Sequence, residues 1–428
     1  MQQLIDDFDA SRNAWRADEV HLLGNEVSAM AAEMTGRSAE GSAGLDQFDP
    51  KIIMQVDWSR GGDAIVAMPG INSVNDLRSK SIAVAPSTPS QTFLIWMLDA
   101  ANLSLNDVEV LEVPSAIDAA TAFKSRKVDA AVVWSPDDEI ATRAVPNSTI
   151  LQSTKEASHI IADIFMVKKK YIDKYPDKIA AFYEGWMKAA AEINANQSNK
   201  EKAAKIFADV TTLGLPDAMA SINNVYLCTH GDNLNFFGKN IEYKGVTGEK
   251  LYTKMGNELE KLDYAPRDRP NWRVMAYPNA ANQANLTGPA HVAERGPDFQ
   301  PVTEADRDIP ALATKPISIN FATGKYSLDQ NAKTIIDIQF ADLAKAYQNA
   351  RIRVEGNTDN VGAKSMNVDL SKKRAQAVAD YLKKAYNVKP NRLIVVGNGP
   401  DNPVKGCESN ATEECKAKNR RTEFQLIR

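Results

Sequence analysis

The sequence has no long apolar run, and this absence limits what the protein can be. Because no stretch of about 18 apolar residues occurs, it predicts no membrane-spanning helix. The start, MQQLIDDFDASRNAW, lacks a basic segment followed by an apolar one, so no secretory signal peptide is visible. The net charge of −4 gives no reason to expect nucleic acid as a partner. Charged residues at 25% and hydrophobic residues at 43% are typical of a globular protein.

Cysteine and histidine are scarce, with 3 and 4 residues in the chain. Cys407 and Cys415 flank a polar segment, GCESNATEEC, and would form a disulfide in an oxidising compartment; two free surface thiols are the alternative. Cys228 fits a small buried apolar residue. Only Cys228 and His230 lie close in sequence, and a metal site needs three or four ligands. We therefore expect neither a metal nor a cofactor.

The length of 428 residues indicates two or three domains. Over residues 1–278, short apolar runs bounded by turn residues alternate with amphipathic stretches, which is typical of α/β sheets. Helices are expected at 92–102 and 116–126, and the pattern is mostly helical over 171–262. The expected strands are 52–56, 63–68, 81–85, 108–113 and 129–134.

Prolines are dense between Pro266 and Pro316, and little there is periodic. We interpret 279–315 as an extended linker. An irregular segment that packs on the first domain is the alternative. The predicted domains are then 1–278 and 316–428.

The region after the linker predicts a small α+β domain of βαβαββ order, with its helices on one face of the sheet. Helical patterns cover 328–347 and 364–386. The expected strands are 317–321, 351–356, 392–399 and 420–428.

One segment of this domain, VEGNTDNVGAKSMNVDLSKKRA (354–375), carries the clearest chemistry. Asp359 follows a strand, and Asn367, Ser371 and Arg374 share one face of the next helix. A carboxylate and a guanidinium that converge can clamp a zwitterion by both of its charges. The alternative is a surface ion pair worth under about 1 kcal/mol.

These motifs resemble the OmpA-like peptidoglycan-binding domain. The resemblance rests on ISINFATGKYSLDQNA, VEGNTDNVG, the N-x-x-LS-x-x-RA helix, VVGNG and KNRRTEFQL, in that order. It implies that the pair of opposite charges holds the diaminopimelate of the wall peptide, and that Cys407 and Cys415 lie where some relatives carry a disulfide. One departure is Asn357, where the family usually has a ring. The residues implied in peptidoglycan binding are Asp359, Arg374, Asn367, Leu370, Thr358 and Arg420.

The N-terminal region offers a weaker signal for a small ligand. SIAVAPSTPSQTFLIWML reads as a strand, a hydroxyl-rich loop and a helix, and a helix start with free N–H groups favours an anion. Ordinary capping by serine or threonine is the alternative. Trp134 follows another strand, at the edge where open α/β sheets bind ligands, or it closes the core. The candidate solute contacts are Trp58, Asp63, Ser87, Thr88, Ser90, Gln91 and Trp134.

Residues 10–265 resemble the periplasmic substrate-binding proteins of ABC importers, in the nitrate, sulfonate and taurine group. GDAIVAMPGINSVNDLRSKSIAVAPSTPSQTFLIWMLDAANLSLNDVEV and AIDAATAFKSRKVDAAVVWSPDDE carry this resemblance. It implies a bilobal (type II) fold with a second lobe at about 73–160 and crossings near 65–69 and 161–167. The chain enters at what resembles the middle of the first lobe. We therefore expect strands before this sequence, and impaired ligand binding without them.

Together these features predict a wall-associated protein of the periplasm that is not an enzyme. It would anchor to peptidoglycan and bind a small solute, with an anion favoured, for uptake by an ABC permease. In a second hypothesis, the solute module has lost its ligand and serves as an interaction spacer. An enzyme is a third hypothesis, but no G-x-S-x-G, H-E-x-x-H or Walker motif occurs and only His159 is a catalytic candidate.

Overall fold

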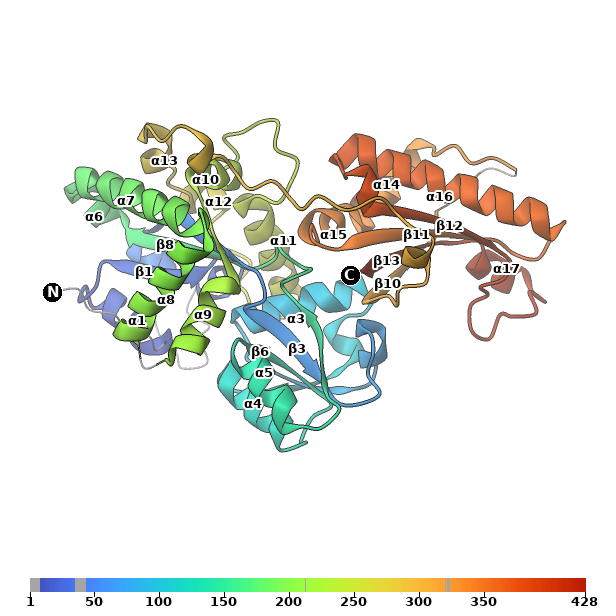
Figure 1. The fold of residues 1–428 in the computed structure, drawn as a ribbon, viewed down its shortest axis with the longest axis horizontal. Helices are drawn as coiled ribbons and strands as arrows, with labels where there is room; N and C mark the ends of the chain where they lie inside the picture. Colours follow the sequence, from blue (N-terminus) through green and yellow to red (C-terminus); the bar gives the residue numbers. More distant parts are fainter. Residues whose placement is uncertain (1–7, 35–43, 212, 320, 322–323) are drawn as a thin grey trace.

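The structure is a computed structural model that describes residues 8–34, 44–211, 213–319, 321 and 324–428. Within these residues the strands form three sheets, each in a separate part of the molecule (Figure 1). Two sheets belong to two α/β lobes, and the third belongs to a module at the C-terminal end.

The first lobe is built on a sheet of order β1-β8-β2-β9, in which neighbouring strands are antiparallel. Its long central strand, β2, is buried over its whole length, as its apolar run predicts. The strands are β1 (Leu22–Glu26), β2 (Pro50–Ser59), β8 (Ala162–Lys168) and β9 (Val225–Leu227). The helices are α1 (Phe8–Arg16), α2 (Met30–Glu33), α6 (Lys169–Lys174), α7 (Pro176–Asn194), α8 (Gln197–Val210), α9 (Leu215–Asn223), α10 (His230–Phe236), α11 (Gly248–Lys261) and α12 (Trp272–Met275).

The second lobe has a sheet of order β5-β4-β6-β3-β7, with β4 parallel to both β5 and β6. The apolar runs predicted as strands at 63–68, 81–85, 108–113 and 129–134 all lie in this sheet. Its strands are β3 (Asp63–Ala67), β4 (Ser81–Val84), β5 (Glu109–Glu112), β6 (Ala130–Trp134) and β7 (Thr149–Ser153). Its helices are α3 (Pro89–Ala100), α4 (Ala116–Lys124) and α5 (Asp137–Ala144).

The chain crosses between the two lobes twice, and both crossings differ from the prediction. It leaves β2 at Ser59 and enters β3 at Asp63, and it returns between Ser153 and Ala162. The predicted crossing at 65–69 is wrong because β3 lies wholly in the second sheet, paired with β6 and β7. The other predicted crossing, 161–167, lies almost entirely in β8 of the first sheet.

The C-terminal module, from β10 onward, has a sheet of order β10-β13-β11-β12 with helices packed on it. Its order of elements follows the predicted βαβαββ pattern, except that the helix predicted at 328–347 is divided into α14 and α15 and a short helix, α17, is added before the last strand. The predicted strand at 317–321 is shifted: the strand is β10, and Asn320 lies outside the described residues. The elements are β10 (Ala313–Ile317), α14 (Gln330–Gln339), α15 (Ala341–Ala346), β11 (Arg351–Asn357), α16 (Lys364–Tyr386), β12 (Leu393–Gly399), α17 (Glu413–Asn419) and β13 (Thr422–Ile427).

The proline-rich segment is packed at both ends, in contrast to the extended linker that its composition predicts. Its first part forms α13 (Asn279–Gln283), which buries two small alanines against α7. Glu294 forms an ion pair with Arg60 of the first crossing between the lobes. Farther on, Asp298 pairs with Lys389 of the C-terminal module at 2.7 Å. Proline density therefore marks irregular backbone here, and the side chains between the prolines still hold it to both neighbours.

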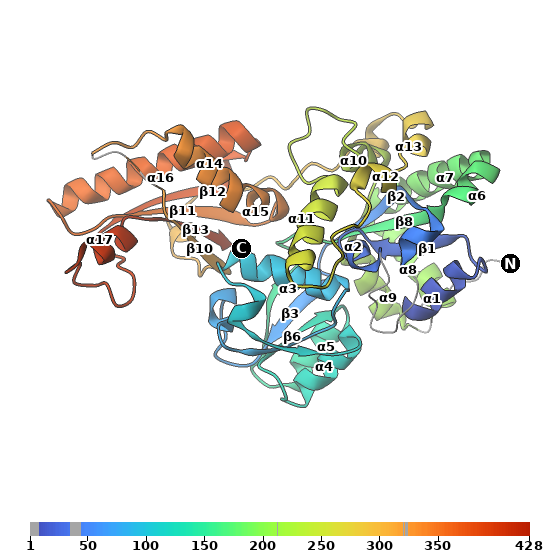
Figure 2. The same ribbon diagram turned by 180° about the vertical axis from the view of Figure 1, so that it is seen from behind.

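The C-terminal module lies beside α3 of the second lobe and α11 of the first lobe (Figure 2). The Asn75 side chain donates to the Thr314 carbonyl at 2.9 Å and accepts from the Thr314 N–H at 2.8 Å. Lys315 is almost fully buried, and its ammonium contacts the Asp99 carboxylate at 2.5 Å. These paired polar groups join the module to the second lobe through a specific interface.

Candidate functional site

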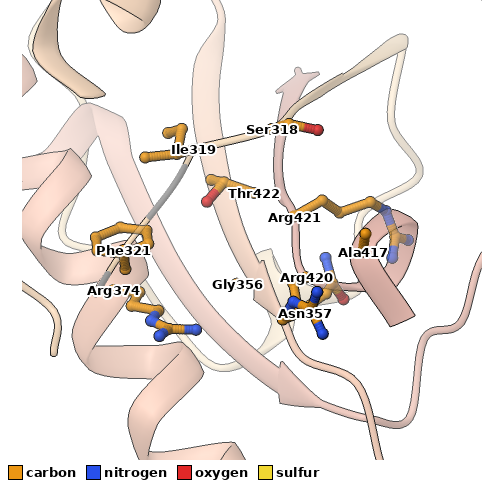
Figure 3. Close-up of a pocket in the computed structure, with 10 residues that line it drawn as sticks. All are labelled: Ser318, Ile319, Phe321, Gly356, Asn357, Arg374, Ala417, Arg420, Arg421 and Thr422. Carbon is orange, nitrogen blue, oxygen red and sulfur yellow. The ribbon is translucent and has the colours of Figure 1, made fainter. Parts of the chain in front are cut away.

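A pocket of about 310 Å³ lies in the C-terminal module where β11 ends and β13 begins. We call it the tail pocket. Figure 3 shows Phe321 and Arg374 on one side of it, and Asn357 with Arg420 on the other. Its lining consists of Ser318, Ile319, Phe321, Gly356, Asn357, Arg374, Ala417, Arg420, Arg421 and Thr422.

Two glycines allow α16 to lie directly on the strands beside this pocket. A Cβ atom on Gly356 would stand 2.2 Å from the carbonyl oxygen of Ser371, and one on Gly397 would stand 2.6 Å from the Lys372 nitrogen. The Ser371 hydroxyl, which is buried, accepts a bond from the N–H of Gly399 at 3.0 Å. The close approach fixes α16, and with it Arg374, relative to the ends of β11 and β12.

Asp359 is largely buried in the loop after β11, and its carboxylate is already occupied. One oxygen accepts from the Arg420 guanidinium at 2.6 Å, and the other accepts from the N–H of Val361 at 3.1 Å. Asn367 donates to the Val361 carbonyl at 3.0 Å and so ties α16 to the same loop. The direct partner of Asp359 is therefore Arg420 of the NRR motif, and not Arg374 of α16, with which the sequence pattern pairs it.

Arg374 lines the tail pocket without a direct bond to Asp359. Its Nε donates to the Lys325 carbonyl at 3.1 Å, and its guanidinium lies 4.9 Å from the Phe321 ring centroid. Burial lowers the pKa of Arg374, the nearby Asp359 charge raises it, and the charge of Arg420 lowers it further. Arg374 is thus close enough to Asp359 for their charges to interact, and its remaining N–H groups face the pocket.

Two other predicted residues shape the loop and helix beside the pocket. The Thr358 hydroxyl donates to the Asp359 carbonyl at 2.8 Å. Leu370 lies half-buried on α16. Sequence reasoning named neither Phe321 nor Arg421 as a site residue, although the ISINF and NRR motifs contain them. The assignment of individual residues to ligand binding stays a prediction.

The polar residues at the start of α3 form hydrogen bonds mainly with one another. Thr88 caps the helix by accepting from the N–H of Ser90 at 3.2 Å, and Gln91 accepts from the N–H of Ser87 at 2.8 Å. This arrangement matches the alternative of ordinary capping. The Ser90 hydroxyl, however, is fully buried and has no partner among the described residues.

The other predicted solute contacts divide into two places. Asp63 and Trp134 are cross-strand partners at the edge of the second sheet that faces the first lobe, and β4, which leads to α3, ends at the same edge. Trp58 instead packs on His159, with ring centroids 4.8 Å apart, and lines a pocket of about 20 Å³. That volume holds a single water. The structure therefore groups Asp63, Trp134 and the α3 start, and separates Trp58 from them.

The two lobes contact each other across this edge. Asn224 of the first lobe donates to the Ser135 hydroxyl of the second at 2.7 Å, and the Tyr264 hydroxyl donates to Glu112. Apolar contact also crosses the gap, because Ile95 of α3 packs on a cluster that contains Ala32 and Leu259. The lobes are therefore closed on one another.

Buried carboxylates gather where the lobes meet. Asp57 and Asp163 are cross-strand partners in the first sheet. Burial raises the pKa of Asp63 to about 6 and that of Asp163 to about 7, and the charge of Asp63 adds to the second shift. The pKa of Asp57 is also raised, by burial and then by both neighbours. Among the described residues, no cluster of histidine, cysteine or acidic side chains could hold a metal ion, and no helix could span a membrane.

Two α/β lobes joined by a double crossing define a bilobal, periplasmic-binding-protein-like fold, and the four-stranded module is an OmpA-like domain. Family models agree: the OmpA family matches residues 320–420, and the "NMT1/THI5 like" family matches 64–200. "Outer membrane protein A" of Bordetella avium is 33% identical over 136 residues, which cover 31% of this chain and 68% of that protein. The chain belongs to the OmpA family through this C-terminal part.

Other relatives match either part of the chain. "Peptidoglycan-binding protein ArfA" of Mycobacterium tuberculosis is 46% identical over 84 residues, 20% of this chain and 24% of that protein. The periplasmic aliphatic sulphonate binding protein SsuA from Escherichia coli shares 16% identity, with a TM-score of 0.48 over 68% of this chain and 84% of that chain. The peptidoglycan-associated lipoprotein from Burkholderia pseudomallei shares 28% identity, with a TM-score of 0.23 over 27% of this chain and 91% of that chain.

The Cys407–Cys415 disulfide that the sequence allows is formed, with the two Cα atoms 5.0 Å apart. It closes the loop that leads into α17 and the paired arginines of the tail pocket. Asn419, fully buried at the end of α17, donates to the Cys407 carbonyl at 3.0 Å. Cys228 is a free, buried thiol, as its apolar neighbourhood predicts.

Proposed function

We propose that this protein is a non-catalytic component of the cell envelope that anchors to peptidoglycan through the tail pocket. The observation that carries the proposal is that Arg374 and Arg420 line one pocket of an OmpA-family module, and that Arg420 is paired with Asp359 beside it. A carboxylate and two guanidinium groups supply both charges needed to hold diaminopimelate, which bears a free carboxylate and a free ammonium. The relative ArfA, named as peptidoglycan-binding, is 46% identical to this chain over 84 residues.

Binding would exchange partners within the pocket. A ligand ammonium would compete with Arg420 for Asp359, and a ligand carboxylate would accept from Arg374. Because each charge-assisted hydrogen bond contributes roughly 1.5–3 kcal/mol against water, two such bonds give reversible anchoring. Repeated binding sites on the wall would then keep the protein local to it.

The experiment is retention of the full chain on purified wall sacculi. We expect Asp359→Ala and Arg374→Ala each to reduce the bound fraction by about ten-fold, the loss of one charge-assisted bond. Asp369→Ala is the matched control, because Asp369 lies on α16 but pairs only with Lys373 at the surface. Equal retention of all three variants would contradict the assignment of the pocket.

For the two lobes, we propose capture of a small solute for ABC-type uptake, with an anionic group at the start of α3. The match of residues 64–200 to the NMT1/THI5-like family supports solute capture. The buried, unpartnered Ser90 hydroxyl at the helix start supports the anionic group. The wall-bound module would hold this receptor near a permease in the envelope.

The contact between the lobes favours one alternative, a solute module that has become an interaction spacer. Ile95 fills part of the gap with apolar contact. Thermal unfolding of the full chain with nitrate, phosphate and an alkanesulfonate distinguishes the two. A solute at 100 times its Kd adds about 2.7 kcal/mol of stability, whereas a spacer shows no shift with any of them.

A further inference from the structure

The tail pocket carries more hydrogen-bond donors than its own residues can satisfy. Three guanidinium groups line it. Arg420 is paired with Asp359 at 2.6 Å and Arg421 with Glu423 at 2.5 Å. Arg374 has no carboxylate within ion-pair distance in the described part of the chain. The pocket therefore holds one positive charge in excess of its carboxylates.

Two buried donors in this lining have no partner among the described residues. They are the Asn357 Nδ2 and the Arg421 Nη1. Asn357 is only 3% exposed and Arg421 only 8% exposed, so solvent satisfies neither donor well. A buried donor left unpaired costs about 1–3 kcal/mol, and more when the group is charged. Both residues line the same pocket (Figure 3).

The surrounding bonds explain why these donors are free. Asn398 donates from one Nδ2 to the Glu355 carboxylate at 2.8 Å and to the Asn357 Oδ1 at 3.1 Å. Because a carboxylate only accepts, the atom of Asn398 that faces Glu355 must be its NH₂ group, and the atom of Asn357 that faces Asn398 must be its oxygen. The NH₂ group of Asn357 is then left without an acceptor among the described residues. Arg421 uses its Nε for Glu423, and its Nη2 for Glu423 and the Asn402 carbonyl. Its Nη1 is what remains.

We infer that Asn357 and Arg421 form a second carboxylate subsite, beside the one that Arg374 would provide, and that Asn357 determines specificity there. This inference rests on the proposed function and names a further feature of the ligand. A carboxylate has two oxygens for the two donors. The wall peptide recognised by the pocket therefore carries two free carboxylates. Amidation of the second one would leave a single accepting oxygen and place an NH₂ group, which cannot accept, against one of the two donors.

The experiment is calorimetric titration of the full chain with the stem tripeptide L-alanyl-γ-D-glutamyl-diaminopimelate. Three forms are compared: all carboxylates free, the glutamyl α-carboxylate amidated, and one diaminopimelate carboxylate amidated. We expect one of the two amidations, the one at the carboxylate bound by Asn357 and Arg421, to raise the Kd of the natural sequence by about ten-fold. This is the effect of losing one charge-assisted hydrogen bond. In Asn357→Asp, which keeps the acceptor for Asn398 but replaces the free donor by an anionic oxygen, this amidation should cost less than two-fold.

Arg421→Lys is a second variant, because lysine keeps a cation for Glu423 and removes the unpaired Nη1. It should lose the same discrimination and so supports the inference even if Asn357→Asp fails to fold. Gln376→Leu removes an amide from the exposed face of α16 and should keep full discrimination. Amidation costs that are equal in the natural sequence and in both subsite variants would overturn the inference. Failure of all three tripeptides to bind the natural sequence would overturn the proposed function as well.

Discussion

The backbone N–H of His159 donates to the carbonyl oxygen of Ala346 at 3.0 Å, which joins the return crossing between the lobes to the C-terminal module. His159 lies between β7 and β8, and Ala346 ends α15. The next residue, Tyr347, is fully buried and donates its hydroxyl to the Met97 sulfur of α3 at 3.1 Å. The crossing and the C-terminal module are therefore joined by direct contacts.

This interface predicts that the lobes and the C-terminal module unfold together. Tyr347→Ala should lower the free energy of unfolding by about 3–5 kcal/mol, because it leaves a large cavity between the modules. Calorimetry should then show two transitions in place of one. Tyr326→Ala is the control, since Tyr326 is half exposed. A single transition in the Tyr347 variant, unchanged in midpoint, would show that the interface contributes no stability.

The close packing of α16 on β11 predicts a strong effect of one methyl group. Gly356→Ala should destabilise the C-terminal module by about 1–3 kcal/mol, because its Cβ would meet the Ser371 carbonyl at 2.2 Å. Gly185→Ala is the matched control: this glycine is exposed in α7, with no atom within 4 Å of the added carbon. There, alanine should stabilise by about 0.5–1 kcal/mol. Denaturant unfolding measures both changes, and equal effects at the two positions would contradict this account of the packing.

Much of this arrangement could be predicted from the sequence. Apolar runs bounded by turn residues located β3, β4, β5 and β6 of the second lobe but not β7. The period of 364–386 gave the bounds of α16, because burial on one face imposes that pattern. The strand β10 was misplaced by a few residues. It contains Pro316, which is tolerated because β10 is an edge strand, whereas the neighbouring ISINF segment fits strand propensity better.

The partner of Asp359 shows what a local pattern leaves undetermined. The local pattern pairs Asp359 with Arg374, and in the structure the charge of Asp359 influences Arg374 without an ion pair between them. The shorter contact comes from Arg420, which is 61 residues away and is positioned by α17 and β13. Likewise, the crossings at 59–63 and 153–162 depend on which sheet accepts β3. The pairing of strands that are distant in sequence leaves no short-range periodic pattern from which it could be predicted.

The carboxylates between the lobes predict that stability falls as pH rises. Folding raises the pKa of Asp63 to about 6, of Asp163 to about 7 and of Glu26 to about 8, mainly through burial. Between about pH 4 and pH 8 the folded state therefore binds more protons than the unfolded state, and the free energy of unfolding decreases with pH. Their stabilising contribution is complete below the unfolded pKa values and is lost by about pH 8.

Asp163→Asn should flatten this slope, because it removes one of the coupled acids and relieves Asp57 and Asp63 of a neighbouring charge. At pH 8 we expect its Tm to rise by about 2 °C, the effect of about 1 kcal/mol. The exposed Asp173→Asn should leave the slope unchanged. Thermal melts from pH 5 to 8 measure the slopes, and a Tm of the natural sequence that climbs steadily over this range would contradict the predicted sign.

The disulfide predicts a redox-dependent stability of the tail pocket. Cys407 and Cys415 are 8 residues apart, and closing a loop of that length restricts the unfolded chain by about 2.5 kcal/mol. Reduction should lower the stability of the C-terminal module by roughly this amount. It should also weaken wall retention, because the loop leads into α17 and hence to Arg420 and Arg421. The double variant Cys407→Ser, Cys415→Ser is the control for the reductant, and it should match the reduced protein and show no further change on reduction. A double variant as stable as the oxidised protein would mean that the crosslink has no part in ordering this loop.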